Sequence, residues 1–412
     1  MKMKKIIYLL LVVVLLIGCR QTPLVKRDKI KLIVASDFHY FLKDYYQDCE
    51  WFEESMLYGD GKMVTSADEI VDAFIKAVKL EKPDLVILTG DLSFNGEKGS
   101  HEALAKKLKA LKSDGIHVAV IPGNHDIDNF SAKGYGKDDY FDVEKTNAKT
   151  FEDIYKDLGY DIAVKKHQDS LSYRIDLNDD YSLLMMDSTS HEQTTGTSLD
   201  VGGIFPDSTQ EWLESQLKDI EKSQKRAIVA MHHNLTHHNE LLNAGYTIKD
   251  NEKIAKLFET YHVPFVLSGH MHCQNIKKIN SIYDIASSSL LDAPLQYGII
   301  ELDKHQMKYH TQSLYISKDA NDYFDQVSSH HFDESFQTIK DQKIRKEMLD
   351  VVVKANRYYF SGNIAKHADE LKAMPGYHYY STSYGEKLDF YKKYLESLMK
   401  DQDDNQNLTL TF

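Results

Sequence analysis

Aspartate, histidine and asparagine side chains recur in five short motifs of this chain, and their types suit metal chemistry. The motifs are Asp37-Phe-His39, Gly90-Asp91, Gly123-Asn124-His125-Asp126, Met-His232-His-Asn and Gly269-His270-Met-His272. Imidazole together with carboxylate favours iron, manganese or zinc, whereas calcium and magnesium sites are built almost wholly from oxygen. Two such cations roughly 3.5–4 Å apart can clamp a phosphoryl group and generate hydroxide from water near neutral pH. The motifs therefore indicate a binuclear phosphoester hydrolase, with metal-bound hydroxide as the nucleophile of an in-line attack.

Asp91 and Asn124 offer ligand atoms of different charge. Asp91 is the candidate for a carboxylate shared by both cations, because the tight Gly90-Asp91 turn brings its backbone and side chain to the centre of the site. Asn124 supplies a neutral amide oxygen, which binds a cation without adding negative charge. Helix capping and turn formation are the ordinary roles of such residues. Their recurrence after five apolar runs makes that explanation weak.

The apolar runs before the five motifs indicate how the chain positions them. Each run is short, uninterrupted and rich in β-branched residues, as expected for a strand buried on both faces. Helical patterns separate the runs, so the candidate ligands fall in loops after strands, where open α/β sheets place their sites. We expect strands at 30–36, 84–89, 117–122, 171–177, 181–186, 226–231, 263–268, 281–286, 296–302 and 307–316, and helices at 66–81, 100–113, 149–158, 208–222 and 251–262. Two helix starts carry capping-box patterns, Ser66-Ala-Asp-Glu69 and Ser208-Thr-Gln-Glu211.

The five motifs resemble those of the calcineurin-like metallophosphoesterase superfamily, which are D-x-H, G-D, G-N-H-[DE], H and G-H-x-H. The resemblance covers residues 29–318 and implies an α/β fold, a four-layer α/β/β/α sandwich. It also implies the ligands of each metal: Asp37, His39, Asp91 and His272 for the first, and Asp91, Asn124, His232 and His270 for the second. His125 would then be the general acid for the leaving oxygen. Asp126 would orient the His125 imidazole.

Within that superfamily the chain is similar to bacterial class III cyclic-nucleotide phosphodiesterases with an added helical C-terminal domain. The resemblance alone favours cyclic nucleotides as substrates. Other phosphoesters stay open as alternatives, namely glycerophosphodiesters, teichoic-acid fragments and nucleotide monoesters. A non-catalytic metal-binding lipoprotein is a further alternative, although it predicts a missing ligand or a missing His125, and neither is missing.

Several polar residues near the motifs have less specific interpretations. We expect His233 to line the pocket, His237 and His238 to face solvent or substrate, and Asp187 to cap a turn or hold a ligand. Asn95, Lys98 and His101 follow Asp91 closely enough to reach a substrate. A helix start near Ser100 is the better explanation for His101, and the role of Asn95 stays open.

The first residues have the features of an export signal. Lys2, Lys4 and Lys5 precede a short apolar stretch that closes with Leu16-Ile17-Gly18-Cys19. This tetrapeptide resembles the lipobox of bacterial lipoproteins, which implies a signal peptide at 1–18, lipidation of Cys19 and a tether at 19–28. An uncleaved membrane anchor is the alternative. Either interpretation predicts attachment to the extracytoplasmic face of a bacterial cell membrane.

The charge balance limits the partners that the chain can bind. A formal net charge of −13 argues against nucleic acid polymers, because clustered lysine and arginine carry that affinity. Small phosphoesters remain compatible with an acidic chain, since bound metals reverse the field locally. Cys49 and Cys273 form either a disulfide at the mouth of the site or two separate thiols. The stretch from Tyr40 to Lys62 is either a substrate-gating loop or a packed insertion.

After residue 318 the pattern becomes helical. Apolar side chains recur at helical spacing at Ile344, Met348, Val351 and Val352, and again at Leu388, Tyr391, Leu395 and Leu398. We expect a small helical C-terminal domain at 319–400, docked on the metallophosphoesterase domain at 29–318. A homodimer surface or a lid over the site is the alternative use of these stripes. Residues 401–412 are expected to form an extended tail.

Overall fold

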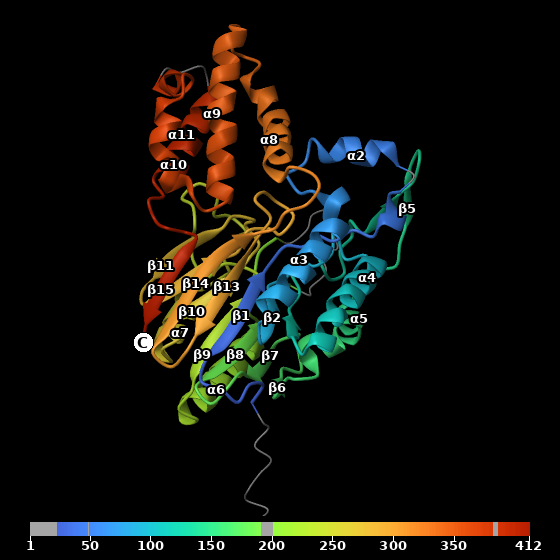
Figure 1. The fold of residues 1–412 in the computed structure, drawn as a ribbon, viewed down its shortest axis with the longest axis vertical. Helices are drawn as coiled ribbons and strands as arrows, with labels where there is room; N and C mark the ends of the chain where they lie inside the picture. The colour runs from blue at the N-terminus through green and yellow to red at the C-terminus, as the bar shows by residue number, and fades with distance from the viewer. Residues whose placement is uncertain (1–22, 48, 191–200, 382–385) are drawn as a thin grey trace, which may run out of the picture.

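Two β-sheets and the helices outside them form the main body of the molecule (Figure 1). The computed structural model describes residues 23–47, 49–190, 201–381 and 386–412. The predicted signal peptide, the cleavage point and Cys19 lie outside these residues. None of the helices in the described ranges is long and apolar enough to cross a membrane.

The first sheet has six strands in the order β15-β14-β13-β1-β2-β3. They are β1 (Ile30–Ala35), β2 (Leu85–Leu88), β3 (His117–Val120), β13 (Gln296–Leu302), β14 (Gln306–Ser313) and β15 (Asn407–Thr411). β1, β2 and β3 are parallel, with Ala35 beside Leu88 and Leu88 beside Val120. The loops that leave these three strands therefore emerge at one edge of the sheet, as the sequence predicts.

The second sheet has seven strands in the order β11-β12-β10-β9-β8-β7-β6. They are β6 (Lys165–Lys166), β7 (Tyr173–Asp176), β8 (Tyr181–Met186), β9 (Arg226–Met231), β10 (Phe265–Ser268), β11 (Asn275–Ile279) and β12 (Ile282–Ala286). β8, β9, β10 and β12 run parallel. The expected strands are present in both sheets within a few residues of their predicted ends.

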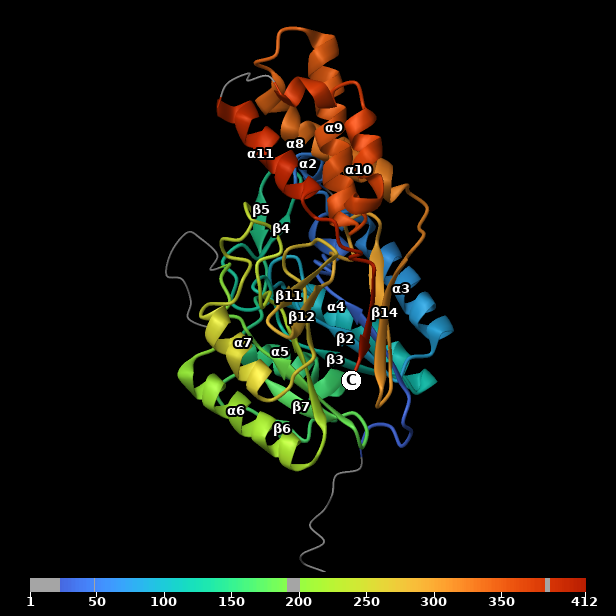
Figure 2. The same cartoon turned by 90° about the vertical axis from the view of Figure 1, so that its left-hand side faces the viewer.

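Alternate side chains along the second sheet explain the layered arrangement. Leu183 and Ile228 belong to the apolar core shared with the first sheet. Their neighbours Leu184 and Val229 point the other way, into a core under α6 (Asp207–Lys222) and α7 (Asn251–Thr260), which cover the outer face (Figure 2). The helices on the side of the first sheet are α3 (Ala67–Glu81), α4 (Lys98–Lys109) and α5 (Ala148–Ile154). The fold is the predicted four-layer α/β/β/α sandwich.

A helical region stands at one end of the two sheets (Figure 1). It consists of α8 (Ala320–Phe336), α9 (Gln342–Phe360), α10 (Ile364–Ala373) and α11 (Glu386–Met399). Asp319 and Asp341 cap α8 and α9, each accepting two backbone N–H groups. The stripes predicted from the sequence form one apolar core, which also includes Met271 and Cys273 from the loop after β10. The helical region therefore packs directly against the chain that carries His270 and His272.

The stretch from Tyr40 to Lys62 is largely a packed insertion. It forms α2 (Glu50–Met56), which the sequence did not indicate, and Phe52 of this helix is fully buried. Phe52 contacts Phe41, Phe94 and Tyr135 in an aromatic cluster. Tyr135 lies in a hairpin of β4 (Lys133–Tyr135) and β5 (Tyr140–Asp142), which is also additional to the prediction.

The structure decides three further points. The capping boxes are wrong: a 3-10 turn at Val64–Ser66 runs into α3, so Ser66 lacks the extended backbone of a capping residue, and α6 begins at Asp207, which places Ser208 inside the helix. Cys49 and Cys273 are buried free thiols rather than a disulfide, and they belong to separate apolar cores. The extended segment after residue 400 is a strand, β15, paired with β14.

Candidate metal centre

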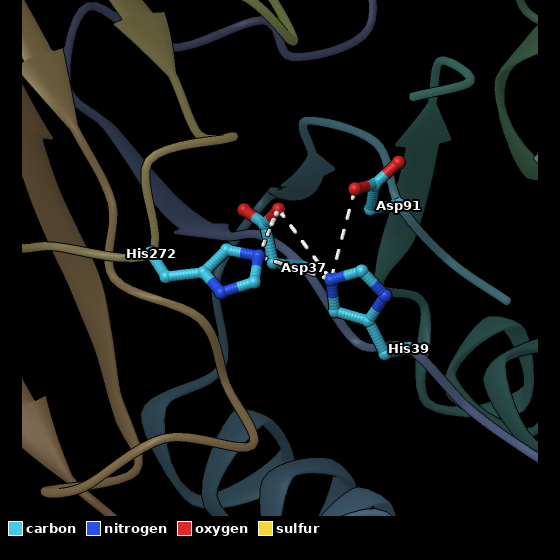
Figure 3. A group of neighbouring side chains, drawn as sticks. All are labelled: Asp37, His39, Asp91 and His272. Atoms are coloured by element: carbon cyan, nitrogen blue, oxygen red, sulfur yellow. Dashed lines mark hydrogen bonds and ion pairs between the residues drawn. The ribbon is translucent and has the colours of Figure 1, made fainter. Parts of the chain in front are cut away.

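The first group of candidate ligands meets at the edge of both sheets (Figure 3). Asp37 and His39 follow β1, Asp91 follows β2, and His272 lies in the loop after β10. His272 Nε2 is 3.4 Å from Asp37 Oδ1 and 3.1 Å from His39 Nε2, and His39 Nε2 is 3.6 Å from Asp91 Oδ2. Metal–ligand distances of roughly 2.0–2.2 Å place the ligands of one ion about 3 Å apart. The spacing of these four side chains therefore fits a single cation.

One carboxylate oxygen of this first group lacks a partner that a cation would supply. Asp37 Oδ1 is buried, faces His272 Nε2 at 3.4 Å, and forms no hydrogen bond within the described residues. His272 directs its other nitrogen, Nδ1, to the buried carboxylate of Asp292, with 3.3 Å between Nδ1 and Oδ2. A carboxylate behind a ligating histidine fixes the ring and increases its basicity. The donor set fits a divalent metal ion.

The second group contains Asp91 again, together with Asn124, His232 and His270. His232 Nε2 is 3.4 Å from Asp91 Oδ2 and 3.0 Å from Asn124 Oδ1. The side chains of Asp91, His232 and His270 offer ligand atoms that all lie within 4.8 Å of one another. Because Asp91 belongs to both groups, the geometry fits two cations that share its carboxylate, as the sequence predicts.

Backbone carbonyls fix the rings of the second group. His232 Nδ1–H donates to the carbonyl of Thr89 at 2.8 Å, which leaves Nε2 facing Asp91 and Asn124. His270 Nε2–H donates to the carbonyl of Gly245 at 3.1 Å, which leaves Nδ1 as its ligating atom. Each histidine is thus held in the tautomer that a metal requires.

The electrostatics of the metal-free site show how strongly the carboxylates attract positive charge. Burial acts to lower the pKa of His232, but Asp91 more than compensates and raises it to about 9. Burial likewise acts against the protonated form of His272, yet Asp292 and Asp37 raise its pKa to about 10. Burial and the neighbouring His232 lower the pKa of His270 to about 4. Protons on these histidines occupy positions that a metal would take.

The backbone at the site is strained. Asp37, His39, Asp91, His270 and His272 all have positive φ, from 35° to 69°. Residues other than glycine seldom adopt this left-handed region, and each such residue costs about 1–3 kcal/mol. Gly90 allows the close approach, since a Cβ there would lie 2.6 Å from His232 Nδ1. The fold therefore holds five candidate ligands in conformations that the chain would not otherwise choose.

His125 lies beside the two groups, with its ring centroid 4.9 Å from that of His39. Its Nδ1 is 2.9 Å from the carbonyl oxygen of Phe94 and 3.0 Å from Asn95 Oδ1, so Nε2 is the nitrogen left for proton exchange. Burial lowers the pKa of His125, and Asp91 opposes that shift. Asn95, whose role the sequence left open, is a hydrogen-bonding partner of this ring.

Asp126 does not touch the imidazole that it was expected to orient. Its carboxylate accepts the backbone N–H groups of Leu92, Ser93 and Gly123 at 2.8–3.0 Å. Asp126 therefore joins the loop after β2 to the loop after β3, and these loops carry Asp91 and Asn124. Its contribution to the site is to fix the backbone of two ligand loops.

The remaining polar residues of the sequence analysis lie outside the two groups. His233, His237 and His238 bond to Ser188, Thr247 and Asn275 respectively, and His238 also faces Asp284. Asp187 accepts backbone N–H groups from Leu171 and Thr189, which is the expected turn-capping role. His101 is buried against Tyr155, and Lys98 pairs with Glu144. His238, which was expected to face solvent or substrate, is buried, and the buried His233 ring lies beside His270, with 4.5 Å between the ring centroids.

Asp292 is a residue that sequence reasoning missed. Like the candidate ligands, it lies after an apolar strand, here Ile282–Ala286. A Ser-Ser-Ser-Leu-Leu stretch separates it from the end of that strand. Lys62 was also missed. Its charge lies within electrostatic reach of His39 and His125, and the only sequence signal is its position after Gly59-Asp60-Gly61.

The whole arrangement combines two groups of metal ligands, a shared carboxylate and a neighbouring histidine, at one edge of an α/β/β/α sandwich. A family model described as Calcineurin-like phosphoesterase matches residues 30–274, which is more than half of the chain. The chain belongs to the calcineurin-like phosphoesterase family. A second model, described as the C-terminal domain of cyclic nucleotide phosphodiesterase, matches residues 306–405 of this phosphoesterase.

Relatives of this phosphoesterase carry the names of two classes of phosphodiesterase. It is 23% identical over 201 residues to a Moraxella catarrhalis protein named "Probable cyclic nucleotide phosphodiesterase", covering 48% of this chain and 62% of the relative. An Arcobacter nitrofigilis protein named "Probable glycerophosphodiester phosphodiesterase" is 32% identical over 85 residues, which is 20% of this chain and 30% of the relative. These matches span less than two thirds of either relative. The names of both relatives are consistent with the family of the chain.

The fold also has a counterpart among solved structures. A dimetal phosphatase from Danio rerio is similar with a TM-score of 0.50 and 12% identity, covering 69% of this chain and 96% of that one. At this identity the similarity supports the shared fold alone.

Proposed function

We propose that this phosphoesterase is a binuclear metal-dependent phosphodiesterase that hydrolyses small phosphodiesters, with cyclic nucleotides as its main substrates. The observation that carries the proposal is the pair of ligand groups that share Asp91, with His125 beside them. The match of residues 306–405 to the C-terminal domain of cyclic nucleotide phosphodiesterase supports the choice of substrate. Glycerophosphodiesters are the second candidate, which the relative from Arcobacter nitrofigilis favours.

The ligand residues and His125 have distinct roles in this proposal. Asp37, His39, Asp91 and His272 would hold one divalent ion, and Asp91, Asn124, His232 and His270 the other. Such a pair of ions supplies charge to stabilise phosphoryl oxygens and lowers the pKa of water. Manganese, iron and zinc all suit this donor set.

His125 handles the proton of the leaving group in this proposal. The bond from Nδ1 to the carbonyl of Phe94 fixes the ring and assigns proton transfer to Nε2. The backbone N–H of His125 donates to Asp91 Oδ1 at 2.9 Å, so the shared carboxylate and the acid keep a fixed relation to each other. Asp126 holds the two loops that carry them.

Turnover by the purified full-length chain, reconstituted with manganese, tests the function. The substrates are bis-p-nitrophenyl phosphate, p-nitrophenyl phosphate and a panel of cyclic nucleotides and glycerophosphodiesters. We expect diester cleavage that requires added metal and is lost in Asp91→Asn and His125→Ala. His305→Ala, which changes an exposed histidine in a turn of the first sheet, is the matched control. Full metal occupancy without cleavage of any ester would contradict the proposal.

We also propose that the protein is anchored by lipid on Cys19 at the extracytoplasmic face of a bacterial membrane. The lipobox-like tetrapeptide Leu16-Ile17-Gly18-Cys19 supports this location. Cys19→Ser should move the protein from the membrane fraction to the soluble fraction while turnover per molecule stays the same. Equal membrane retention of the variant and the unaltered chain would argue for an uncleaved anchor instead.

A further inference from the structure

Lys62 places a cation beside a centre whose other charged groups are carboxylates and histidines. Its side chain is only 10% exposed, and Nζ lies 2.9 Å from Asp60 Oδ2. Among the described residues this is the single ion pair of Lys62. An ammonium group has three N–H donors, so Asp60 leaves donor capacity that can serve a ligand.

The charge of Lys62 acts on the candidate metal centre. Burial lowers the pKa of His39, and the next largest cause is Lys62. Burial and Lys62 together also oppose the protonated form of His125. Lys62 itself stays protonated, because Asp60, Asp292 and Asp91 outweigh the effect of burial and raise its pKa. The ammonium therefore lies within electrostatic reach of the shared carboxylate and the proposed acid.

The loop that carries Lys62 is fixed from two sides. Met63 N–H donates to the carbonyl of Leu291 at 3.0 Å, which ties the loop to the segment carrying Asp292. At Gly61, whose φ is +108°, a Cβ would lie 2.8 Å from the ring of Phe324 on α8 and 3.2 Å from Asp292 Oδ1. The loop thus sits between the helical region and the carboxylate that holds His272.

Open space borders the same loop. A cavity of about 280 Å³ is lined by Gly59 and Asp60 on one side and by helical-region residues, including Phe360 and Tyr394, on the other. Asp60, the ion-pair partner of Lys62, therefore borders a space large enough for a small ligand.

Asp60 compensates part of the Lys62 charge, and the negative charge of a substrate phosphate would compensate the rest once the centre holds two divalent cations. We propose that Lys62 is a substrate-binding residue, which donates hydrogen bonds to a non-bridging oxygen of the substrate phosphate. This inference rests on the proposed phosphodiesterase function. It also gives the helical region a role in the site, since Phe324 packs against the loop that presents Lys62. Lysine is suited to this task because it binds phosphate as a compact charge.

Binding of inorganic phosphate to the metal-loaded, full-length chain tests the proposal by isothermal titration calorimetry. We expect Lys62→Met to raise the Kd for phosphate at least roughly tenfold, as the loss of one charged hydrogen bond implies. Lys62→Arg keeps the charge and should stay within about threefold of the unaltered chain. Lys400→Met removes an exposed lysine that pairs with Glu240, and serves as the matched control. Metal content and melting temperature are measured on every sample.

The outcomes separate ligand binding from structural support. An unchanged phosphate affinity in Lys62→Met, with full metal content, would overturn the proposal. A loss of affinity that merely follows a loss of bound metal would overturn it as well. Because calorimetry needs no turnover, Lys62-dependent phosphate binding by a chain that hydrolyses no ester would refute the phosphodiesterase function and leave Lys62 as a phosphate-binding residue only.

Discussion

The ligand-bearing edge of the sheets and the helical region are built in opposite ways. At the edge, five candidate ligands have positive φ, and polar atoms such as Asp37 Oδ1 are buried without a hydrogen bond. In the helical region, Asp319 and Asp341 cap their helices and the apolar stripes close into one core. The edge is shaped for binding at a cost in stability, whereas the helical region follows the ordinary rules of stable helices. Substitutions in the two regions should therefore affect different properties.

The strongest test of this contrast is Asp91→Asn. We expect kcat/KM to fall by more than roughly 100-fold, because Asp91 belongs to both ligand groups. Mutation of a residue that merely supports a metal ligand already lowers metal affinity or activity by roughly 10–100-fold. The melting temperature of the metal-free protein should fall only slightly, since asparagine tolerates the φ of 48° at this position and only the pairing with protonated His232 is lost. A metal-free variant that melts far below the unaltered chain would show that the edge does carry stability.

Leu398→Ala makes the opposite change in the helical region. Leu398 is fully buried in the helical core, so its truncation should reduce the free energy of unfolding by about 2–5 kcal/mol. Turnover per folded molecule should stay near that of the unaltered chain. Chemical denaturation and a turnover assay well below the melting temperature measure the two effects. A large loss of turnover by fully folded Leu398→Ala protein would contradict the proposed difference between the two regions.

Asp292→Asn sharpens the contrast at the point where the regions meet. Asp292 holds His272 and also packs against Gly61 of the loop under α8. Loss of its charge should weaken metal binding by roughly 10–100-fold, mainly in the first ligand group. Competitive metal titration with a chelating dye would detect this. Asp303→Asn, a change in an exposed turn of the first sheet, is the control.

The buried carboxyl group of Glu97 should make the free energy of unfolding depend on pH. Burial raises its pKa to about 8, although the backbone N–H of Asn95 partly compensates. The unfolded chain releases this proton near pH 4.5, so stability falls as pH rises from about 4.5 to about 8. Glu97→Gln should remove this component, so the free energy of unfolding at pH 8 should rise relative to that at pH 5 by about 3–4 kcal/mol. Parallel pH profiles of both proteins would contradict the assignment.

The smallest expected effect concerns a helix cap. Asp341 accepts the backbone N–H groups of Lys343 and Ile344, so Asp341→Ala should reduce the free energy of unfolding by about 1 kcal/mol. Turnover should be unchanged. Asp350→Ala, on the exposed surface of the same helix, controls for the loss of a carboxylate. Equal effects of the two changes on the free energy of unfolding would show that the cap does not stabilise the helix.

The sequence predicted the parts of the molecule that depend on local pattern. The seven candidate ligands follow five apolar strands, so the motifs at the strand ends were enough to locate Asp37, Asp91 and His232. The roles that depend on distant partners were not visible. Asp126 was expected to orient His125, but its partners Leu92 and Ser93 lie in another loop. Lys62 and Asp292 likewise gain their meaning from contacts between segments that are far apart in the chain, which no local spacing encodes.

The capping boxes failed for a local reason that spacing alone cannot express. A Ser-x-x-Glu pattern specifies side chains, but a cap also needs an extended backbone at the serine. At Ser66 a preceding 3-10 turn gives φ −103° and ψ 4°, so the hydroxyl does not cap the helix. The helix begins where it was predicted, although the mechanism of its start differs.

The strand β15 has a mechanical consequence for the helical region. The chain leaves the first sheet at the end of β14, builds α8 to α11, and returns as β15, which pairs with β14 along His310–Asn407 and Gln306–Thr411. Adjacent strands are only about 4.8 Å apart. Both ends of the segment that carries the four helices are therefore joined to two neighbouring strands of the same sheet. Two attachments so close together restrict rigid-body motion of the helical region. The region is therefore suited to form a fixed side of the ligand space rather than a mobile lid.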